Sequence, residues 1–213
     1  LLNEREVKHL QSLLKGCRNV VLTCHVRPDG DAVGSTLGLL HLLQSMGIKA
    51  RVITPDQPPR SLEFLPGFSD IVPYARYSDY GSRLVDEADL IIGCDFNQLS
   101  RLSDLEPAIA SAKAKKVIID HHEHPDVAAD LLISYPDMSS TCELVFRLIA
   151  AMGYFEFVSF ESATCLCTGI ITDTRNLSVN CQHLDIYEIM LELLRMGVNK
   201  SLILKETMDT KSE

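Results

Sequence analysis

The chain has 213 residues, of which 46% are hydrophobic and 23% are charged, and its formal net charge is −9 at pH 7. This size and composition are typical of a globular protein with a sizeable hydrophobic core. The negative charge argues against a protein that binds long duplex nucleic acid through a basic face, and no apolar run approaches the ~18 residues that a membrane-spanning helix needs.

The N-terminal part of the chain predicts helices and strands that alternate. Residues 3–15 open with an Asn-x-x-Glu capping box and continue with apolar residues at helical spacing. Residues 19–24 (NVVLTC) and 49–54 (KARVIT) are short and rich in β-branched residues, which indicates strands. Between them, residues 32–46 return to helical spacing and stop before Gly47. The resulting order is helix, strand, helix, strand.

The loop after the first strand gathers one imidazole and two carboxylates. His25 follows the strand directly, and Asp29 and Asp31 flank Gly30, which we expect to form a tight turn after Pro28. Imidazole combined with carboxylates suits Mn²⁺ or a related divalent cation better than structural zinc. The N-terminus of the following helix would favour the anion that this cation holds. Taken alone, the same residues also fit a surface histidine and an ordinary turn.

Two further strands end at residues with metal-ligand chemistry. Residues 88–94 (ADLIIGC) lead into Asp95, and residues 116–119 (KVII) lead into DHHEH at 120–124. A solvated polar loop is the alternative interpretation of this second cluster. Ligands of parallel α/β sheets gather beyond the carboxyl ends of the strands, where all these side chains are expected. The sequence therefore predicts a parallel sheet covered on both faces, an α/β/α sandwich.

The remaining segments complete this pattern. Residues 55–88 are rich in proline and predict short helices and one brief strand. Asp173 follows a buried helix and is either a turn residue or one more ligand. Further elements are expected as a short helix at 107–113, an edge strand at 131–134, and helices at 140–152, 159–172, 184–195 and 201–208.

Four segments resemble the motifs of the DHH phosphoesterase family. They are His25-x-x-Pro28-Asp29-x-Asp31-x-x-Gly34-Ser35, Asp95, Asp120-His121-His122 and Gly169-Ile-Ile-Thr-Asp173-Thr174. The family includes RecJ-type exonucleases, nanoRNase/pAp phosphatases, cyclic-dinucleotide phosphodiesterases, exopolyphosphatases and manganese inorganic pyrophosphatases. The chain looks most like the nanoRNase/pAp-phosphatase branch, and the resemblance covers most of its length.

The resemblance implies a site that holds two Mn²⁺ ions. One ion would bind His25, Asp29 and Asp95, and the other would bind Asp31, Asp95, His121 and Asp173. Asp95 would therefore bridge the two ions. His122 would contact the scissile phosphate, and Asp120 would orient an imidazole from behind. The resemblance assigns no further substrate-binding residue.

The implied function is that of a Mn²⁺-dependent phosphohydrolase acting on very short oligoribonucleotides, pAp or cyclic dinucleotides. The alternatives are an exopolyphosphatase or inorganic pyrophosphatase, and a nucleotide-binding regulatory module without turnover. The presence of all six ligands argues against the regulatory module. We expect small phosphorylated nucleotides or short RNA as partners, a homodimer is compatible with this prediction, and a cytoplasmic location follows from the lack of a membrane span or signal peptide pattern.

The chain departs from the family pattern in two places. Arg175 and Leu177 stand where the family usually has Gly and Phe, so the turn after the last motif is expected to differ. The chain also lacks the smaller C-terminal domain whose glycine- and histidine-rich loop grips the substrate. We therefore expect residues 1–197 to form the DHH catalytic domain and residues 198–213 to begin a linker toward a substrate domain absent from this chain.

Overall fold

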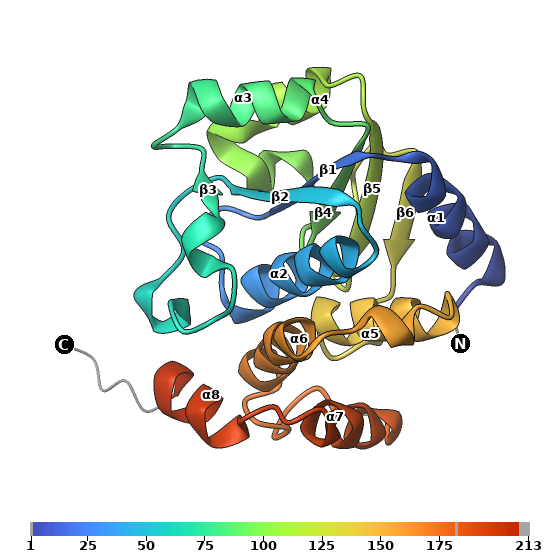
Figure 1. Ribbon diagram of the computed structural model, residues 1–213, viewed down its shortest axis with the longest axis vertical. Coiled ribbons are helices and arrows are strands. Elements are labelled where there is room, and N and C mark those ends of the chain that lie inside the picture. Colours follow the sequence, from blue (N-terminus) through green and yellow to red (C-terminus); the bar gives the residue numbers. More distant parts are fainter. Residues whose placement is uncertain (1, 182, 209–213) are drawn as a thin grey trace.

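The computed structural model describes residues 2–181 and 183–208 and is built around one six-stranded sheet (Figure 1). All neighbouring strands run parallel, in the order β3-β2-β1-β4-β5-β6. The strands are β1 (Asn19–Cys24), β2 (Lys49–Thr54), β3 (Val72–Pro73), β4 (Leu90–Cys94), β5 (Lys115–Asp120) and β6 (Leu131–Ser134).

Helices cover both faces of the sheet, which confirms the predicted α/β/α sandwich (Figure 1). One face carries α3 (Ser78–Asp86), α4 (Glu106–Ser111) and the 3₁₀ helix η3 (Leu99–Leu105). The other carries α1 (Glu4–Gly16), α2 (Gly30–Ser45) and α5 (Thr141–Ala151). Helix α6 (Phe160–Asp173) packs on α2 and α5, and α7 (Asp185–Arg195) and α8 (Lys200–Thr207) pack on α6.

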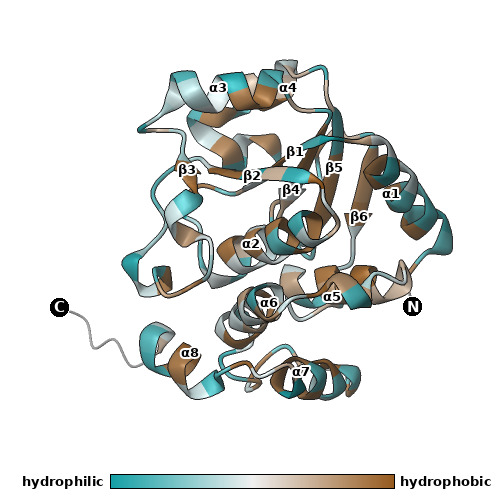
Figure 2. Ribbon diagram, in the orientation of Figure 1, coloured by the Kyte–Doolittle hydropathy of each residue, from teal (hydrophilic) through white to brown (hydrophobic). Residues whose placement is uncertain are grey.

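The hydrophobic core has two parts because side chains along each strand alternate between the sheet faces. Along β1, Val20 and Leu22 belong to the core under α2, whereas Val21 belongs to the core under α3 and α4. Figure 2 shows the hydrophobic residues concentrated on the central strands. Strands buried on both faces are expected to be apolar throughout, as these are.

The strand register brings three sequence motifs to one edge of the sheet. Cys24 of β1 is aligned with Cys94 of β4, and Cys94 is aligned with Ile119 of β5. The next residues, His25, Asp95 and Asp120, therefore lie side by side. Strand β1 has β2 as its neighbour on one side and β4 on the other, so the strand order reverses direction at β1. Open α/β sheets bind ligands at the carboxyl ends of the strands beside such a topological switch point.

Close contact between α2 and α6 brings the other two motifs to the same place. A Cβ atom on Gly34 would lie 2.6 Å from the carbonyl oxygen of Cys165, and one on Gly169 would lie 2.8 Å from Asp31 Oδ1. A side chain at Gly34 would force the two helices apart, and one at Gly169 would meet Cys142 of α5 as well as Asp31. Because the helices run antiparallel, Asp31 at the start of α2 faces Asp173 at the end of α6.

Helix α2 begins earlier than the sequence predicts. Its first residue is Gly30, and the Oδ1 atom of Asp29 accepts hydrogen bonds from the backbone N–H groups of Asp31 and Ala32 at 3.0 and 3.1 Å. The prediction of Gly30 as a tight turn was wrong because Asp29 acts as an N-cap and starts the helix there. The start of α2 therefore fixes the Asp29 carboxylate as the cap and places Asp31 in the first turn.

The C-terminal end of the described chain forms the short helix α8. Its Ile203 is buried, and the helix contacts α6. The division into residues 1–197 and 198–213 stays a prediction. Within residues 2–181 and 183–208, every helix falls short of the length or apolar character needed to cross a membrane.

The turn after α6 contains three successive left-handed residues, and whether it differs from the turn of other family members stays a prediction. Arg175, Asn176 and Leu177 have φ values of 47°, 58° and 63°. Asn tolerates this conformation, whereas a side chain such as that of Arg costs roughly 1–2 kcal/mol there. The turn lies two residues after Asp173, the last residue of α6, so its geometry sets the direction of the chain beyond the last predicted ligand.

We expect Arg175→Gly to stabilise the protein by about 0.5–1 kcal/mol, because glycine relieves the left-handed strain but adds freedom to the unfolded chain. This corresponds to a rise of roughly 2 °C in the melting temperature. Thermal unfolding of this variant and of Arg175→Lys, which keeps the strain, tests the prediction. Equal melting temperatures for the two variants would contradict it.

Candidate metal centre

Two groups of side chains with metal-ligand chemistry face each other at the switch point. They come from the ends of β1, β4 and β5, the start of α2 and the end of α6. Within each group, one ligand atom per residue lies within 4.8 Å of the others. The first group is His25, Asp29 and Asp95, and the second is Asp31, His121 and Asp173. Asp95, His121 and His122 form a third set within the same distance, which overlaps the other two.

In the first group, the imidazole of His25 points at two carboxylates. Its Nε2 atom lies 3.4 Å from Asp95 Oδ2 and 3.8 Å from Asp29 Oδ2. The Nδ1 atom lies 2.8 Å from the carbonyl oxygen of Val26, which can only accept, so Nδ1 carries the proton. The Nε2 lone pair is therefore free for a cation between the carboxylates.

In the second group, His121 has the corresponding arrangement. Its Nε2 atom lies 3.6 Å from Asp173 Oδ2 and 3.9 Å from Asp31 Oδ2. The Nδ1 atom donates to the carbonyl oxygen of Met138 at 3.2 Å, which again leaves Nε2 free. Both imidazoles are thus oriented as metal ligands by backbone carbonyls.

Asp95 lies between the two groups. Its Oδ2 atom faces His25 at 3.4 Å, and its Oδ1 atom faces His121 at 3.6 Å. The residue is buried, has a left-handed φ of 65°, and donates its backbone N–H to Ile119. A carboxylate with one oxygen toward each ligand group has the placement of a bridging ligand.

Asp120 and His122 form a pair beside these groups. The fully buried carboxylate of Asp120 accepts hydrogen bonds from His122 Nδ1 at 2.7 Å and from the His122 backbone N–H at 3.1 Å. This contact leaves Nε2 of His122 available, and the ring is part-exposed. The structure therefore brings together all eight residues that the sequence predicts for the site, and Asp120 lies on the far side of the His122 ring from its free Nε2 atom. The eight are His25, Asp29, Asp31, Asp95, Asp120, His121, His122 and Asp173.

The carboxylates repel one another when no cation is bound. Burial, followed by the charges of Asp95 and Asp173, raises the pKa of Asp31 well above its usual value. Burial also raises the pKa of Asp173 to about 6, against the opposing effect of His121. In Asp95, the effect of burial is outweighed by the neighbouring imidazoles, of which His25 acts most strongly, so the pKa of Asp95 is lowered. A divalent cation would relieve this repulsion, so imidazoles and carboxylates together fit such an ion.

We expect Mn²⁺ to stabilise the protein much more at about pH 7.5 than at about pH 5. The unfolded pKa of Asp is about 3.9. Because the folded pKa values of Asp31 and Asp173 are raised, the metal-free folded state binds extra protons above that value and loses stability as the pH rises toward about 6. Below about pH 6, Mn²⁺ must displace these protons.

At a concentration of 100 times its dissociation constant, Mn²⁺ would contribute about 2.7 kcal/mol, or a melting-temperature rise of roughly 5–10 °C at about pH 7.5. Thermal unfolding with and without Mn²⁺ at both pH values measures this difference. An increase of equal size at both pH values would contradict the assigned carboxylates.

The sequence analysis missed the contribution of helix α5 to this site. The backbone N–H groups of Thr141 and Cys142 donate to the Asp31 carboxylate at 2.7 and 2.9 Å. The hydroxyl of Thr141 donates to Asp95 Oδ1 at 3.0 Å. The helix predicted at 140–152 does begin there, with Ser140 as its N-cap, and an anion at a helix start is what the free N–H groups favour.

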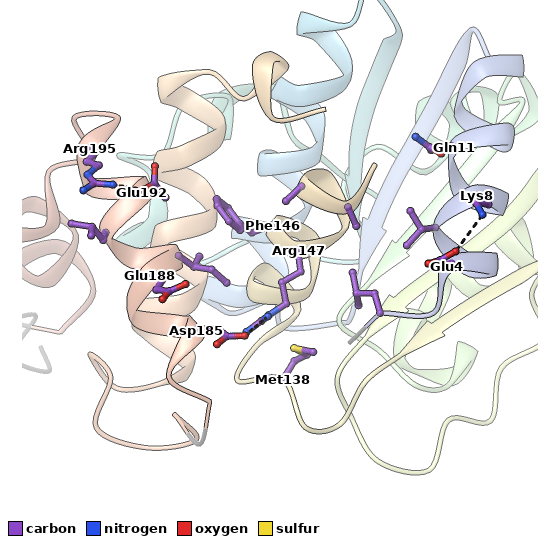
Figure 3. Close-up of a pocket in the computed structure, with 16 residues that line it drawn as sticks. Glu4, Lys8, Gln11, Met138, Phe146, Arg147, Asp185, Glu188, Glu192 and Arg195 are labelled. Atoms are coloured by element: carbon purple, nitrogen blue, oxygen red, sulfur yellow. Dashed lines mark hydrogen bonds and ion pairs between the residues drawn. The ribbon is translucent and has the colours of Figure 1, made fainter. Parts of the chain in front are cut away.

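A separate hollow of about 1080 Å³ lies between α1, α5 and α7 (Figure 3). Arg147 of α5 and Asp185 of α7 form an ion pair of 3.2 Å in its wall. None of the eight residues described above lines this hollow. The candidate metal centre at the sheet edge is therefore distinct from the hollow.

A family model and several curated proteins match this chain over most of its length. The family model described as "DHH family, N-terminal domain" matches residues 19–170. The bifunctional oligoribonuclease and PAP phosphatase NrnA of Thermus thermophilus is 32% identical over 179 residues, which are 84% of this chain and 50% of that protein. The chain spans about half the length of the curated NrnA relatives it matches.

Two solved structures are also similar. An exopolyphosphatase-related protein from Bacteroides fragilis is 40% identical, with a TM-score of 0.97 over 100% of this chain and 63% of its own. The exonuclease RecJ bound to manganese is 18% identical, with a TM-score of 0.52 over 92% of this chain and 48% of its own. The RecJ match supports the same fold.

Proposed function

Because the chain belongs to the DHH family, we propose that it is the catalytic domain of a Mn²⁺-dependent phosphohydrolase. Its substrates would be very short oligoribonucleotides, pAp or cyclic dinucleotides. The observation that carries this proposal is the pair of ligand groups with Asp95 between them. Such an arrangement suits two divalent ions that share one carboxylate.

The proposed ligands divide as the geometry suggests. One Mn²⁺ would bind His25, Asp29 and Asp95, and the other would bind Asp31, Asp95, His121 and Asp173. When bound, two such ions activate water as a nucleophile and neutralise charge on the phosphate oxygens. The chain's own contribution is to hold both imidazoles with Nε2 free and to keep Asp95 in place between them.

His122 would contact the phosphate of the substrate. The hydrogen bond with Asp120 raises the pKa of His122, and burial opposes this change only in part. A raised pKa favours the protonated ring, whose Nε2–H can donate to a phosphate oxygen. Asp120 would act through His122 by fixing which nitrogen faces the substrate.

The substrate class rests on the similarity to NrnA, whose name describes an oligoribonuclease and PAP phosphatase. Polyphosphate is a second candidate, because the Bacteroides fragilis protein at 40% identity is called exopolyphosphatase-related. A regulatory module without turnover is less consistent with a site in which all six ligands converge.

We also propose that residues 1–197 are the catalytic domain and that residues 198–213 lead toward a domain that positions the substrate. The shorter length of this chain relative to NrnA supports the idea. Without such a domain, remote binding energy would be lost, so the chain should bind Mn²⁺ but turn over slowly. Homodimer formation stays a prediction.

The test is hydrolysis of pAp, a diribonucleotide, a cyclic dinucleotide and polyphosphate by this chain with Mn²⁺, next to a Mn²⁺ titration. We expect two bound ions and the highest kcat/KM on pAp or the diribonucleotide. A preference for polyphosphate would replace the substrate assignment. Failure to bind Mn²⁺ would remove the proposed function itself.

A further inference from the structure

Residues 138–143, which we call the α5 N-terminal segment, contact three of the six proposed ligands. The carbonyl oxygen of Met138 accepts from His121, and two backbone N–H groups of the segment donate to Asp31. The Thr141 hydroxyl donates to Asp95 Oδ1 at 3.0 Å. One short stretch of chain therefore supports ligands from β4, β5 and α2.

Thr141 acts on the carboxylate that lies between the two ligand groups. Its side chain is fully buried, so the hydrogen bond to Asp95 is shielded from water. The bond holds Oδ1 on the side of His121 and leaves Oδ2 on the side of His25. A freely rotating carboxylate would lose this division between its two oxygens.

Glu143 holds the α5 N-terminal segment in place through its buried carboxylate. Its buried carboxylate accepts from the backbone N–H of Ser139 at 2.8 Å and pairs with Arg147 at 2.7 and 2.8 Å. Arg147 extends this contact to Asp185 of α7, in the wall of the hollow (Figure 3). A buried carboxylate with these partners holds a fixed position, because any movement would leave a charge unpaired.

We infer that Thr141 and Glu143 are positioning residues of the metal centre. Thr141 sets the orientation of Asp95 between the two ligand groups. Glu143 fixes the α5 N-terminal segment, and through it the support of Asp31 and His121. This inference rests on the proposed function, since it concerns how the proposed ligands are held for Mn²⁺. Groups that orient metal ligands typically change metal affinity by 10–100-fold when they are removed.

The test compares Thr141→Val, which keeps the shape but removes the hydroxyl, with Thr141→Ser, which keeps the hydroxyl. Mn²⁺ titration calorimetry gives affinity and stoichiometry, and electron paramagnetic resonance reports whether two bound Mn²⁺ ions are coupled. We expect Thr141→Val to bind Mn²⁺ 10–100-fold more weakly and to lose part of the coupled signal. Thr141→Ser should bind Mn²⁺ like the unsubstituted chain.

Glu143→Gln gives a second measurement that does not depend on the folding of the Thr141 variants. It keeps the hydrogen bond to Ser139 but weakens the pairing with Arg147, and we expect Mn²⁺ affinity to fall by about 10-fold. Thermal unfolding without metal shows whether each variant is folded.

The outcomes separate the inference from the proposed function. Mn²⁺ binding by the unsubstituted chain together with unchanged binding by Thr141→Val and Glu143→Gln would overturn the inference and leave the proposed function standing. A lower metal-free melting temperature with unchanged affinity would show a purely structural role and overturn it as well. No Mn²⁺ binding by the unsubstituted chain would overturn the proposed function first.

Discussion

Asp95→Asn should lower phosphohydrolase activity by about 10³-fold or more, equivalent to a loss of about 4 kcal/mol of transition-state stabilisation. The carboxylate of Asp95 presents one oxygen to His25 and the other to His121. Asparagine keeps one oxygen but replaces the other with an NH₂ group, which does not bind a cation. The variant would therefore lose the ligand shared by the two proposed ions.

The same substitution should leave the fold intact. Asp95 has a left-handed φ of 65°, a conformation that Asn also tolerates well. The amide oxygen can still accept the hydrogen bond from Thr141. Loss of activity would thus reflect the metal centre and not general unfolding.

Steady-state kinetics and the number of bound Mn²⁺ ions per chain measure this effect, with circular dichroism as the test of folding. His124→Ala is the matched control, because His124 is highly exposed and belongs to neither ligand group. Turnover by Asp95→Asn close to that of His124→Ala would remove Asp95 from the mechanism.

The fold could be predicted from the sequence because its strands are strongly marked. The run LIIGC in β4 is buried on every residue, and a strand without polar positions belongs in the middle of a parallel sheet. Once β1, β4 and β5 are parallel neighbours, the residues at their carboxyl ends must meet at one edge of the sheet. The placement of His25, Asp95 and Asp120 therefore followed from local patterns.

The support of the ligands could not be predicted in the same way. Asp31 and the Thr141 N–H that binds it are 110 positions apart in the sequence. A local sequence pattern does not show that the start of α5 faces the Asp31 carboxylate, because this contact depends on how α5 packs against α2. The left-handed φ of Asp95 is likewise imposed by the tertiary structure on a residue that local propensity would not single out.

The error at the start of α2 has a different cause. Asp29 and Gly30 are common in turns, so the sequence analysis assigned them to a turn, although Asp is equally common as an N-cap. The structure selects the cap, since the Asp29 side chain accepts from two N–H groups of the first turn. The other oxygen of Asp29 remains directed toward His25 at 3.8 Å, so one side chain serves the helix and the candidate site together.

Removal of divalent cations should abolish hydrolysis, and Mn²⁺ should restore it far better than Ca²⁺. Each ligand group contains one imidazole, from His25 or from His121, whose Nε2 atom is kept free by a backbone carbonyl that binds Nδ1. Ca²⁺ prefers six to eight oxygen ligands in flexible sites, whereas Mn²⁺ accepts imidazole together with carboxylates. The free imidazole nitrogens therefore favour Mn²⁺.

The experiment treats the chain with excess chelator, removes the chelator by dialysis, and measures hydrolysis after addition of Mn²⁺ or Ca²⁺. We expect background activity without metal and recovery with Mn²⁺ but little with Ca²⁺, and recovery should need more Mn²⁺ below about pH 6 than above it, because Asp173 must lose its proton to bind the ion. His25→Gln is an informative partner variant, since it replaces an imidazole nitrogen with an amide and should narrow the preference for Mn²⁺ over Ca²⁺. Activity that survives exhaustive chelation would show that the carboxylates and imidazoles of this site work without a cation, and the two-metal proposal would then be wrong.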